Sequence, residues 1–426
     1  MHIVVRLLVI AGILSARLLA AGPLLVRLWA AGRREDLLRA VGVVLSRAAE
    51  SLGPAAIKIA QVASYRRDLI SQPLAAALSR VQDKVNPLPP GALNAELLTA
   101  YDDRVDEHFR VLNHEPIGAG SIAVVIRGTT VDGEDVAIKV VRPGVKSRIE
   151  LDLRVMRWTL ALFARHRRWR GIPILETFDL FALSVLTQCD MINEAEIACQ
   201  LKTTGSTDII IPRPRLDLTR GNVLVMSYEE PLYKLTDARL GQRTYEAACR
   251  ILLHELYRMI FISGVVHCDL HPGNVAITRG GKVVLYDTGL ATRLSRKDRE
   301  TFRDLFLAVA LNNSTGLAWQ IIEGAGECPD TLDYTSLHSD CGALLASRSG
   351  QTAGHFLVFG FVTELFDIQR KHGLRSAPGF ASAIWALAMF EGLVRDQYPD
   401  LDFQGEALTF LVPKMMALSE PTGRHP

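Results

Sequence analysis

The amino-acid sequence predicts an α+β fold with two lobes, preceded by a helical extension and completed by a mostly helical second lobe. Three observations lead to this prediction. Apolar residues recur at helical spacing through the first hundred residues, strand-like alternation starts near residue 108, and helical spacing returns after residue 297. The 426 residues are 49% hydrophobic and 22% charged, which is enough for a sizeable core and excludes a largely disordered chain.

The first 32 residues are the most apolar part of a chain whose mean hydropathy is +0.16. Two uncharged runs, residues 7–16 and 18–26, are separated by Arg17. Each run is shorter than the about 20 apolar residues that cross a bilayer. One continuous span would place Arg17 near the bilayer centre at a cost of roughly 2.5–3.5 kcal/mol, and Pro23 would interrupt it.

Arg6, Arg17 and Arg27 are spaced so that a helix places them on one face. We therefore expect an interfacial helix whose arginine side chains extend toward the lipid headgroups. Two alternatives stay open: a helix that packs on the protein itself, and a membrane span or signal peptide.

The balance of charged residues and the positions of the cysteines argue against some classes of protein. Lys and Arg (48) nearly balance Asp and Glu (46), which argues against general nucleic-acid binding. The basic run at residues 164–170 is interpreted as a solvated helix end. The cysteines show neither a CxxC pair nor a zinc-ligand spacing. We expect reduced, mostly buried thiols at positions 189, 199, 249, 268, 328 and 341.

A helical extension is predicted before the first lobe. Apolar positions such as Leu37, Leu38 and Val41 recur at helical spacing, and the prolines within residues 86–90 end these helices. The predicted parts of the chain are an apolar N-terminal region at 1–34, the extension at 35–105, a first lobe at 106–228 and a helical second lobe at 229–426.

The remaining elements follow from the same patterns. Three strands are predicted at 109–116, 122–127 and 134–141, and Val131-Asp132-Gly133 supplies the turn between the last two. The further predictions are helices at 93–101, 147–170, 173–201 and 244–263, strands at 209–211 and 222–228, and short strands within 265–278 and 282–286. After Lys297 only helices are predicted, with breaks at 312–313, 324–329 and 377–379.

Two features of the first lobe suggest phosphate chemistry. Gly118, Ala119, Gly120 and Ser121 lie between two predicted strands, where small residues let backbone N–H groups approach phosphates, although an ordinary tight turn would use the same residues. Lys139 lies inside an apolar strand, where an ammonium needs a partner. In the kinase pattern such a lysine binds phosphates and a helix glutamate, and Glu194 is the candidate.

The segment His267-Cys268-Asp269-Leu270-His271-Pro272-Gly273-Asn274 is the most specific one in the chain. It has the spacing of the kinase catalytic loop, in which the aspartate orients or deprotonates the attacking hydroxyl and the asparagine binds a metal ion. Asp287-Thr288-Gly289 follows thirteen residues later, at the place of the aspartate that holds Mg²⁺ between phosphates. The predicted roles are therefore catalysis for Asp269, Lys139 and Glu194, and metal binding for Asn274 and Asp287.

These motifs resemble those of the UbiB-type family of atypical protein-kinase-like proteins, which includes quinone-biosynthesis regulators. The segments that carry the resemblance are residues 52–61, with a signature similar to Lys-x-Gly-Gln, residues 116–124, residues 139–144 and Asp269-Leu270-His271-Pro272-Gly273-Asn274. The resemblance implies a two-lobe protein-kinase-like fold that binds ATP and Mg²⁺. It also implies that signature helices cover the site where a protein substrate would dock. The nucleotide-binding candidates are Gly118, Ala119, Gly120, Ser121, Lys139 and Met226.

The chain departs from this family in residues that the resemblance links to regulation. The signature glycine is Ala60, the family's Glu-x-Asp is Gln188-Cys189-Asp190, and the phenylalanine of D-F-G is Thr288. A neutral Gln188 would deprive Lys58 of a charge partner and weaken the docking of the signature helix. The regulatory candidates are Lys58, Gln61, Gln188 and Asp190.

The function predicted from these residues is an ATP- and Mg²⁺-dependent atypical kinase or ATPase that supports isoprenoid-quinone, lipid or secondary-metabolite biosynthesis at a membrane. A nucleotide-binding scaffold without catalysis and a small-molecule phosphotransferase are the alternatives. The expected partners are ATP, a membrane lipid or isoprenoid-type small molecule and a biosynthetic protein complex, with no nucleic acid. The expected location is the cytoplasm, peripheral to the inner face of a membrane.

Overall fold

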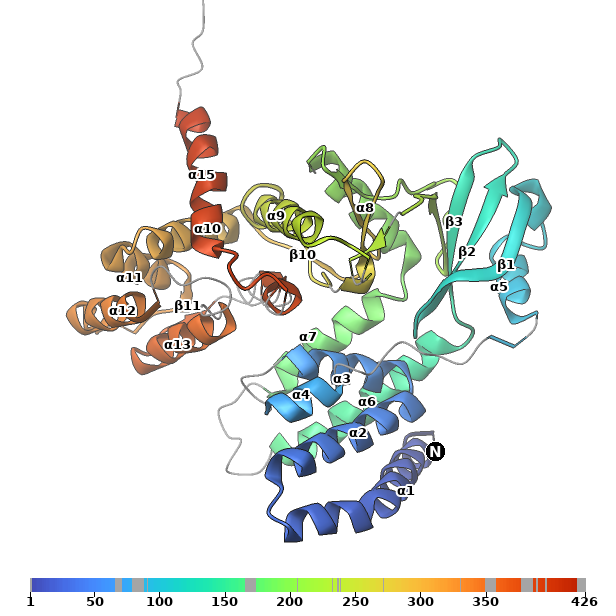
Figure 1. Cartoon of the computed structure of the whole chain (residues 1–426), viewed down its shortest axis with the longest axis horizontal. Coiled ribbons are helices and arrows are strands. Elements are labelled where there is room, and N and C mark those ends of the chain that lie inside the picture. The colour runs from blue at the N-terminus through green and yellow to red at the C-terminus, as the bar shows by residue number, and fades with distance from the viewer. Residues whose placement is uncertain are drawn as a thin grey trace, which may run out of the picture. The chain divides into compact units, whose positions relative to one another are not determined.

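The computed structural model describes residues 2–65, 71–78, 88–89, 91–164, 174–204, 206–231, 233–235, 237, 239–270, 272–329, 331–348, 358–376, 386–387, 390–394 and 397–419. The chain forms two compact units (Figure 1). The first contains Met1–Glu196 and Arg213–Tyr228, and the second contains Ile197–Pro212 and Glu229–Pro426. The predicted N-terminal region and extension both lie in the first unit, and the finer four-part division stays a prediction.

Four helices open the first unit: α1 (His2–Ala30), α2 (Arg34–Leu52), α3 (Pro54–Tyr65) and α4 (Gln72–Leu78). The boundary between α2 and α3 follows from its residues. Gly53 has φ 109°, a conformation that favours glycine, and Pro54 then occupies the first position of α3, where no N–H is needed. Ala49, Leu52, Ala56 and Ile57 form the core of this helical layer with Ala60 and Leu78.

Helix α1 runs through Pro23 without a break, so the expected interruption at this proline is wrong. A proline in a helix interior removes one backbone hydrogen bond, at a cost of about 3 kcal/mol. The helical turns on both sides of Pro23 are present, so the helix continues through it. The helix is long and apolar enough to cross a membrane by length and composition, over Val4–Ala30.

The sheet of the first unit has the order β1-β2-β3-β5 and is antiparallel throughout. Its strands are β1 (Phe109–Ala119), β2 (Ala123–Thr130), β3 (Asp135–Val141) and β5 (Val223–Ser227), which confirms the predicted strands and extends the first one. Because side chains alternate along a strand, β3 contributes Val136, Ile138 and Val140 to a core beneath α5 (Ala92–Ala100). The side chain of Lys139 lies on the opposite face of β3.

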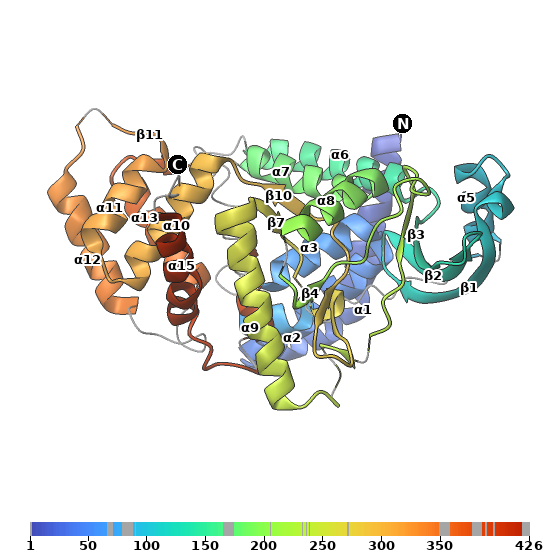
Figure 2. The same cartoon turned by 90° about the horizontal axis from the view of Figure 1, so that it is seen from above.

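Three helices pack on the other face of the sheet: α6 (Val145–Ala164), α7 (Ile174–Thr187) and α8 (Met191–Thr204). Helices α6 and α7 lie side by side (Figure 2). The expected single helix over 173–201 is therefore wrong, because it breaks at Gln188–Asp190. Asp190 causes the new start, since its Oδ1 accepts from the N–H groups of Ile192 and Asn193 at 3.1 Å each.

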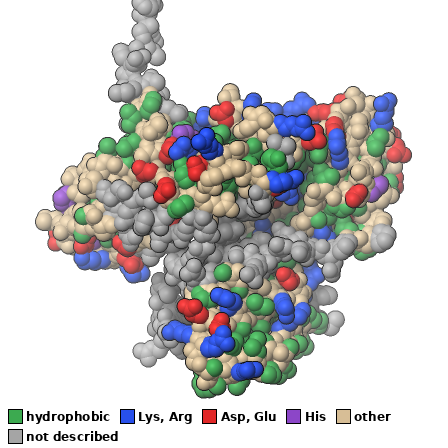
Figure 3. Space-filling view, in the orientation of Figure 1, with side chains coloured by type: hydrophobic (Ala, Val, Ile, Leu, Met, Phe, Trp, Pro, Cys, Tyr) green, Lys and Arg blue, Asp and Glu red, His purple; other side chains and the backbone are tan. Residues whose placement is uncertain are grey.

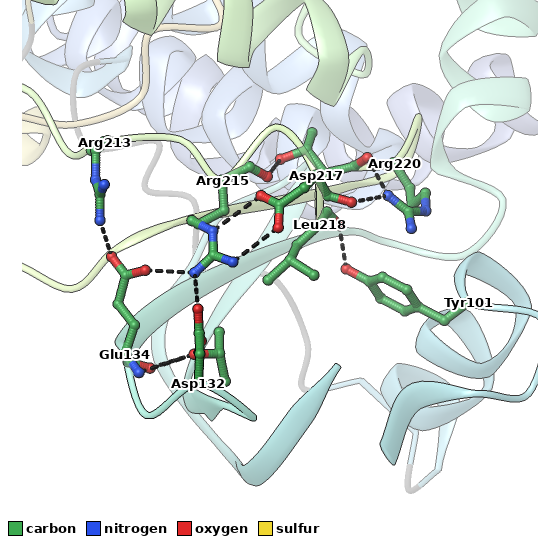
Figure 4. Close-up of polar contacts among 10 residues, drawn as sticks. Tyr101, Asp132, Glu134, Arg213, Arg215, Asp217, Leu218 and Arg220 are labelled. Carbon is green, nitrogen blue, oxygen red and sulfur yellow. Dashed lines mark hydrogen bonds and ion pairs between the residues drawn. The ribbon is translucent and has the colours of Figure 1, made fainter. Parts of the chain in front are cut away.

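A group of ion pairs holds the segment before β5 against the turn between β2 and β3 (Figure 4). We call it the hairpin network, and it consists of Asp132, Glu134, Arg213, Arg215 and Asp217. The Arg215 guanidinium donates to Glu134 at 2.6 Å, to Asp217 at 2.9 and 3.0 Å, and to Asp132 at 3.1 Å. The network thus joins parts of the chain about eighty residues apart.

The second unit contains two small sheets near its chemistry-bearing residues. One has the order β4-β9-β8-β6, from β4 (Ile209–Ile210), β6 (Tyr233–Lys234), β8 (Val275–Ile277) and β9 (Val283–Leu285). The other pairs β7 (Val265–His267) with β10 (Ala291–Arg293). Helix α9 (Gln242–Arg258) continues into a π-helical turn, Met259–Ser263, which together match the predicted helix over 244–263.

The last part of the second unit is mostly helical. Its helices include α10 (Arg296–Ala310), α11 (Ser314–Glu323), α12 (Tyr334–Arg348), α13 (Val358–Lys371) and α15 (Phe403–Ser419). The prediction of helices alone after Lys297 is wrong at one place, because β11 (Ala325–Glu327) pairs with β12 (Arg375–Ser376). Two strands this short and this far apart leave no local alternation to detect. Elsewhere the predicted two-lobe α+β architecture is confirmed.

Candidate functional site

Lys139 and Glu194 form a buried ion pair in the first unit. The Lys139 Nζ donates to both carboxylate oxygens of Glu194, at 2.8 and 2.9 Å. The side chains are 10% and 2% exposed, so water screens the two charges little. The predicted contact between these residues, 55 positions apart, is therefore present, whereas their catalytic roles stay predictions.

Secondary structure fixes both members of this pair. Lys139 lies opposite Val125 of β2 and Leu224 of β5, so neighbouring strands hold its backbone on both sides. Glu194 lies in the first turn of α8, and its N–H donates to the carbonyl of Asp190 at 3.0 Å. Asp190, predicted to be regulatory, thus caps the helix that presents Glu194.

The small residues at the end of β1 lead into a tight turn. Gly118 and Ala119 are still paired with β2, and the Gly120 N–H donates to the Ala123 carbonyl at 2.9 Å. This amide is used within the hairpin, and the contribution of Gly120 to nucleotide binding stays a prediction. A Cβ on Gly118 or Gly120 would approach its nearest neighbour only to 3.6 Å, an ordinary contact. The fold itself therefore does not require either glycine.

Ser121 and Met226 are the other nucleotide candidates in this unit. Ser121 is buried at 3% exposure, in the bend that follows Gly120. Met226 is half-buried on β5 opposite Ala137 of β3. Sequence reasoning missed Arg142, whose Nε donates to the Gly120 carbonyl at 2.8 Å while its N–H donates to Ile122. Its position directly after β3, in the 139–144 segment, was the available signal.

The predicted catalytic loop lies in the second unit and is held by its own polar groups. His267 ends β7 and is fully buried, and its Nδ1 accepts from the Asp269 N–H at 3.1 Å. The Asn274 Nδ2 donates to the Asp269 carbonyl at 3.1 Å. Asp269 and Asn274 are 8% and 7% exposed. His271 of the same motif lies outside the described residues.

Asn274 and Asp287 are brought to one end of a β-hairpin. Asn274 directly precedes β8, and Asp287 follows β9 by two residues. Val275 pairs with Leu285, and the Tyr286 N–H donates to the Asn274 carbonyl at 2.9 Å. Asp287 has φ 52°, a left-handed conformation that is uncommon outside glycine and that persists mainly at functional sites. The structure thus places the two predicted metal ligands close in the fold.

The chemistry of these two side chains fits Mg²⁺. Magnesium prefers hard oxygen ligands and is commonly held by one or two protein groups together with substrate phosphates and water. Asp287 supplies a carboxylate. Because Asn274 Nδ2 donates the hydrogen bond to Asp269, the amide oxygen of Asn274 is available as the second metal ligand. Within the described residues no group of three or more His, Cys, Asp or Glu is placed to bind a metal.

The cysteines do not take part in this arrangement. All six are free thiols, which confirms the expectation. Burial raises the pKa of Cys268 to about 12, with a further contribution from the Asp269 charge. A thiol with such a pKa stays protonated and unreactive at neutral pH, so Cys268 serves as a small apolar residue beside Asp269.

The remaining regulatory candidates are placed as follows. Lys58 is half-buried on α3, and Gln61 lies on the same helix, although its side chain is outside the described part. Gln188 is buried after the end of α7, and its amide donates weakly to the Ser184 carbonyl at 3.5 Å. Among the described residues it forms no hydrogen bond with Lys58. The proposed effect of Gln188 on Lys58 stays a prediction.

The chain is similar in sequence to known proteins over most of its length. Residues 80–320, more than half of the chain, match the ABC1 atypical kinase-like domain. A probable protein kinase UbiB of Azotobacter vinelandii is 28% identical over 408 residues, covering 92% of this chain and 74% of the relative. A protein of the same name from Pseudomonas paraeruginosa is 26% identical over 400 residues, covering 90% and 73%.

Two further matches support the same assignment. An uncharacterized protein of Synechocystis is 26% identical over 364 residues, covering 82% of this chain and 89% of that protein. A solved structure, the complex of Rv3197 with erythromycin from Mycobacterium tuberculosis, shares the fold with a TM-score of 0.56 at 16% identity, covering 84% of this chain and 93% of that one. Given the domain match and the kinase motifs in their expected order, the chain belongs to the ABC1 atypical kinase-like family.

Proposed function

We propose that this protein is an ATP- and Mg²⁺-dependent kinase or ATPase that supports isoprenoid-quinone, lipid or secondary-metabolite biosynthesis at a membrane. The buried Lys139–Glu194 pair is the observation that carries the proposal. A buried ion pair costs more in desolvation than most folds recover, so a role in binding explains it better than stability does.

In this proposal Lys139 binds the α- and β-phosphates of ATP, and Glu194 holds the ammonium in position. Because the pair is buried and both carboxylate oxygens accept from Nζ, the ammonium is fixed before the nucleotide arrives. Such preorganised charge stabilises the negative charge that develops during phosphoryl transfer.

Asn274 and Asp287 would hold Mg²⁺, which when bound supplies positive charge to the phosphates. Asp269 accepts the proton of the attacking hydroxyl or water, or orients that group. His267 and Asn274 hold the backbone of Asp269 through the two hydrogen bonds described above. The acceptor is a small molecule, a lipid or water, since the family resemblance disfavours a general protein substrate.

Helix α1 supports a location at a membrane surface. Arg6 and Arg17 face the protein, because Arg6 binds Asp152 of α6 and Arg17 donates to Ser51 of α2 at 2.9 Å. Ile10 and Ile13, on the same face, pack against the helical core. This overturns the expectation that these arginines reach toward lipid headgroups.

The opposite face of α1 is apolar and exposed, as the hydrophobic side chains at the lower edge of Figure 3 show. Its residues include Leu8, Leu19, Val26 and Trp29, with Leu19 78% and Trp29 74% exposed. Exposed apolar surface of this extent marks an interaction site. Since α1 packs on α2 and α6, the helix lies on the membrane and does not cross it, on the cytoplasmic face in this proposal.

The catalytic proposal is tested with Asp287→Asn and Asp269→Asn. ATP turnover with Mg²⁺ and lipid vesicles should fall by about hundredfold or more in both, while Asp367→Asn, an exposed carboxylate on α13, should match the wild type. Equal turnover in all four proteins would refute catalysis at this site. Mg-ATP binding without turnover would favour the scaffold, and transfer to a soluble alcohol the small-molecule phosphotransferase.

The membrane proposal is tested separately by vesicle flotation. Leu19→Gln with Trp29→Gln should reduce the fraction of protein that floats, because both apolar side chains would leave the lipid. The matched control is Trp319→Gln on α11, which also removes an exposed tryptophan, 55% exposed in this case. Flotation that falls equally in the control would refute a specific role of α1.

A further inference from the structure

A pocket of about 620 Å³ lies within the first unit, apart from the Lys139–Glu194 pair. Pockets that bind small molecules measure roughly 300–1,000 Å³, so its size suits a ligand. We call it the arginine pocket. It is formed by α1, α2, the start of α3, the bend after Gly120 and the turn between β3 and α6. Its charged lining residues are Arg17, Arg47, Glu50, Arg142 and Arg148.

The arginine pocket concentrates positive charge. Among the described residues that line it, there are four arginines and one carboxylate, Glu50. Among the described residues, Arg17, Arg47 and Arg148 form no ion pair with an acidic side chain. Arg17 donates to the Ser51 hydroxyl and Arg148 to the Leu52 carbonyl at 3.0 Å, both of which are neutral acceptors. Converging like charges repel one another, and a bound anion would remove this repulsion.

The backbone around the pocket is shaped to admit these side chains. A Cβ on Gly53 would lie 3.2–3.3 Å from the guanidinium of Arg148, so a larger residue would displace this guanidinium by a few tenths of an ångström. Gly53 also has the left-handed φ of 109° noted above. Pro54 begins α3 beside the pocket, and the N-terminal end of a twelve-residue helix carries partial positive charge. These features add to the attraction for an anion.

We propose that the arginine pocket binds a phosphate- or diphosphate-bearing ligand at a site that shares only Ser121 with the nucleotide-binding candidates. Guanidinium groups match phosphate oxygens in pairs of hydrogen bonds, and four of them suit more than one negative charge. Two sources share this chemistry, a soluble diphosphate and the headgroup of an anionic lipid. The inference goes beyond the proposed function, because it requires no turnover and no nucleotide.

The pocket is also connected to the turn that follows β1. Ser121 and Arg142 line it, and the Arg142 Nε donates to the Gly120 carbonyl. A ligand held by Arg142 would therefore be linked through this side chain to the turn that carries the nucleotide candidates Gly120 and Ser121.

The test measures binding of inorganic pyrophosphate to the full chain by calorimetry, without Mg²⁺ or nucleotide. Arg47→Gln should weaken binding by about tenfold, because one guanidinium–phosphate contact is lost. This guanidinium forms no hydrogen bond within the described part of the chain, so the variant should fold normally. The matched control is Arg39→Gln, an exposed arginine on the same helix outside the pocket, which should bind as the wild type does.

A second variant protects the test against misfolding. Glu50→Gln removes the only carboxylate among the described residues that line the pocket, so pyrophosphate should bind more tightly than to the wild type. A damaged protein cannot produce this gain. The proposal is overturned if Arg47→Gln and Glu50→Gln bind pyrophosphate as Arg39→Gln does. It is also overturned if Lys139→Met loses pyrophosphate binding while Arg47→Gln keeps it.

Vesicles distinguish the two ligand sources. A lipid headgroup predicts stronger flotation with phosphatidylglycerol vesicles than with phosphatidylcholine vesicles, and Arg47→Gln should remove that difference. A soluble diphosphate predicts that Arg47→Gln changes pyrophosphate binding and leaves the flotation difference intact. If neither measurement separates Arg47→Gln from Arg39→Gln, the arginine pocket does not bind phosphate groups.

Discussion

Two groups of charged side chains in the first unit join elements that are distant in sequence, but they differ in exposure. The Lys139–Glu194 pair is buried, with side chains 10% and 2% exposed. The hairpin network lies at the surface, where Asp132 and Asp217 are 57% and 62% exposed. Burial of opposite charges is costly, whereas exposed pairs cost and contribute little. Under the proposed function, the difference in burial distinguishes an ion pair that serves catalysis from one that only joins two surface segments.

The largest expected effect comes from breaking the buried pair. Lys139→Met should lower the free energy of unfolding by about 3 kcal/mol, because Glu194 would remain buried and charged without its partner. Turnover of ATP should fall by at least about hundredfold. Denaturant unfolding and a phosphate-release assay measure the two effects. Lys146→Met, an exposed lysine on α6, is the control for loss of a positive charge.

The double variant Lys139→Met with Glu194→Leu sharpens this result. Both charges are removed, so much of the lost stability should return, since apolar residues can replace a buried ion pair at little cost. Turnover should not return. Recovery of both quantities would show that the pair serves stability alone and would contradict its proposed role.

A second buried pair tests whether burial by itself marks a catalytic group. Arg6 of α1 donates to the Asp152 carboxylate, at 2.9 Å through Nη2, and to the Leu52 carbonyl at 2.7 Å, and Asp152 is 3% exposed. Arg6→Gln should cost about 2 kcal/mol of stability, since Asp152 would lose its charge partner. ATP affinity should be unchanged. Arg27→Gln, exposed on the same helix, should alter neither quantity.

The hairpin network should give a smaller effect. Arg215→Gln should lower the free energy of unfolding by about 1 kcal/mol, the usual range for exposed ion pairs, without changing ATP turnover. Arg110→Gln, exposed on β1, controls for the change of charge. Loss of turnover in Arg215→Gln at unchanged stability would instead place the hairpin network in the active site, like the buried pair.

The pH dependence of the same variant gives an independent check. Hydrogen bonds from Arg215 hold the pKa of Glu134 and of Asp217 below their ordinary values. A carboxylate with a lowered pKa in the folded state stabilises the fold above its ordinary pKa of about 4, and this contribution disappears as the pH falls through the lowered pKa. The stability difference between wild type and Arg215→Gln should therefore be constant near neutral pH and shrink below about pH 4.

Local patterns in the sequence predict much of the fold and bring the two halves of the buried pair together. The alternation in residues 134–141 places Lys139 within a strand, and the kinase order then selects Glu194 as its partner. The positions of Asn274 and Asp287 are predictable as well, because the two residues lie close together in the sequence and belong to kinase motifs.

Features that depend on long-range packing are not visible in such patterns. Arg6 meets Asp152 across 146 positions, and β11 meets β12 across about fifty. Nothing local specifies either contact. The helical face that contains Arg6 and Arg17 is predictable, but which way it faces is decided by Asp152 and Ser51 on other helices. The left-handed backbone of Asp287 also lacks a sequence signal, since glycine is the usual residue there.

The smallest effect on stability is expected for Gly120→Ala, which separates fold from ligand in the turn after β1. The new methyl group would meet its nearest neighbour, the Ala123 carbonyl oxygen, at 3.6 Å, so stability should change by less than about 0.5 kcal/mol. Gly128→Ala is the contrast, because its Cβ would lie 3.0 Å from the Val111 carbonyl oxygen and 2.9 Å from Ile138, and crowding should destabilise by about 1–3 kcal/mol. If Gly120 leaves room for phosphates, Gly120→Ala should weaken Mg-ATP binding in calorimetry while its unfolding curve matches the wild type. Equal destabilisation by both variants would instead assign Gly120 to the fold.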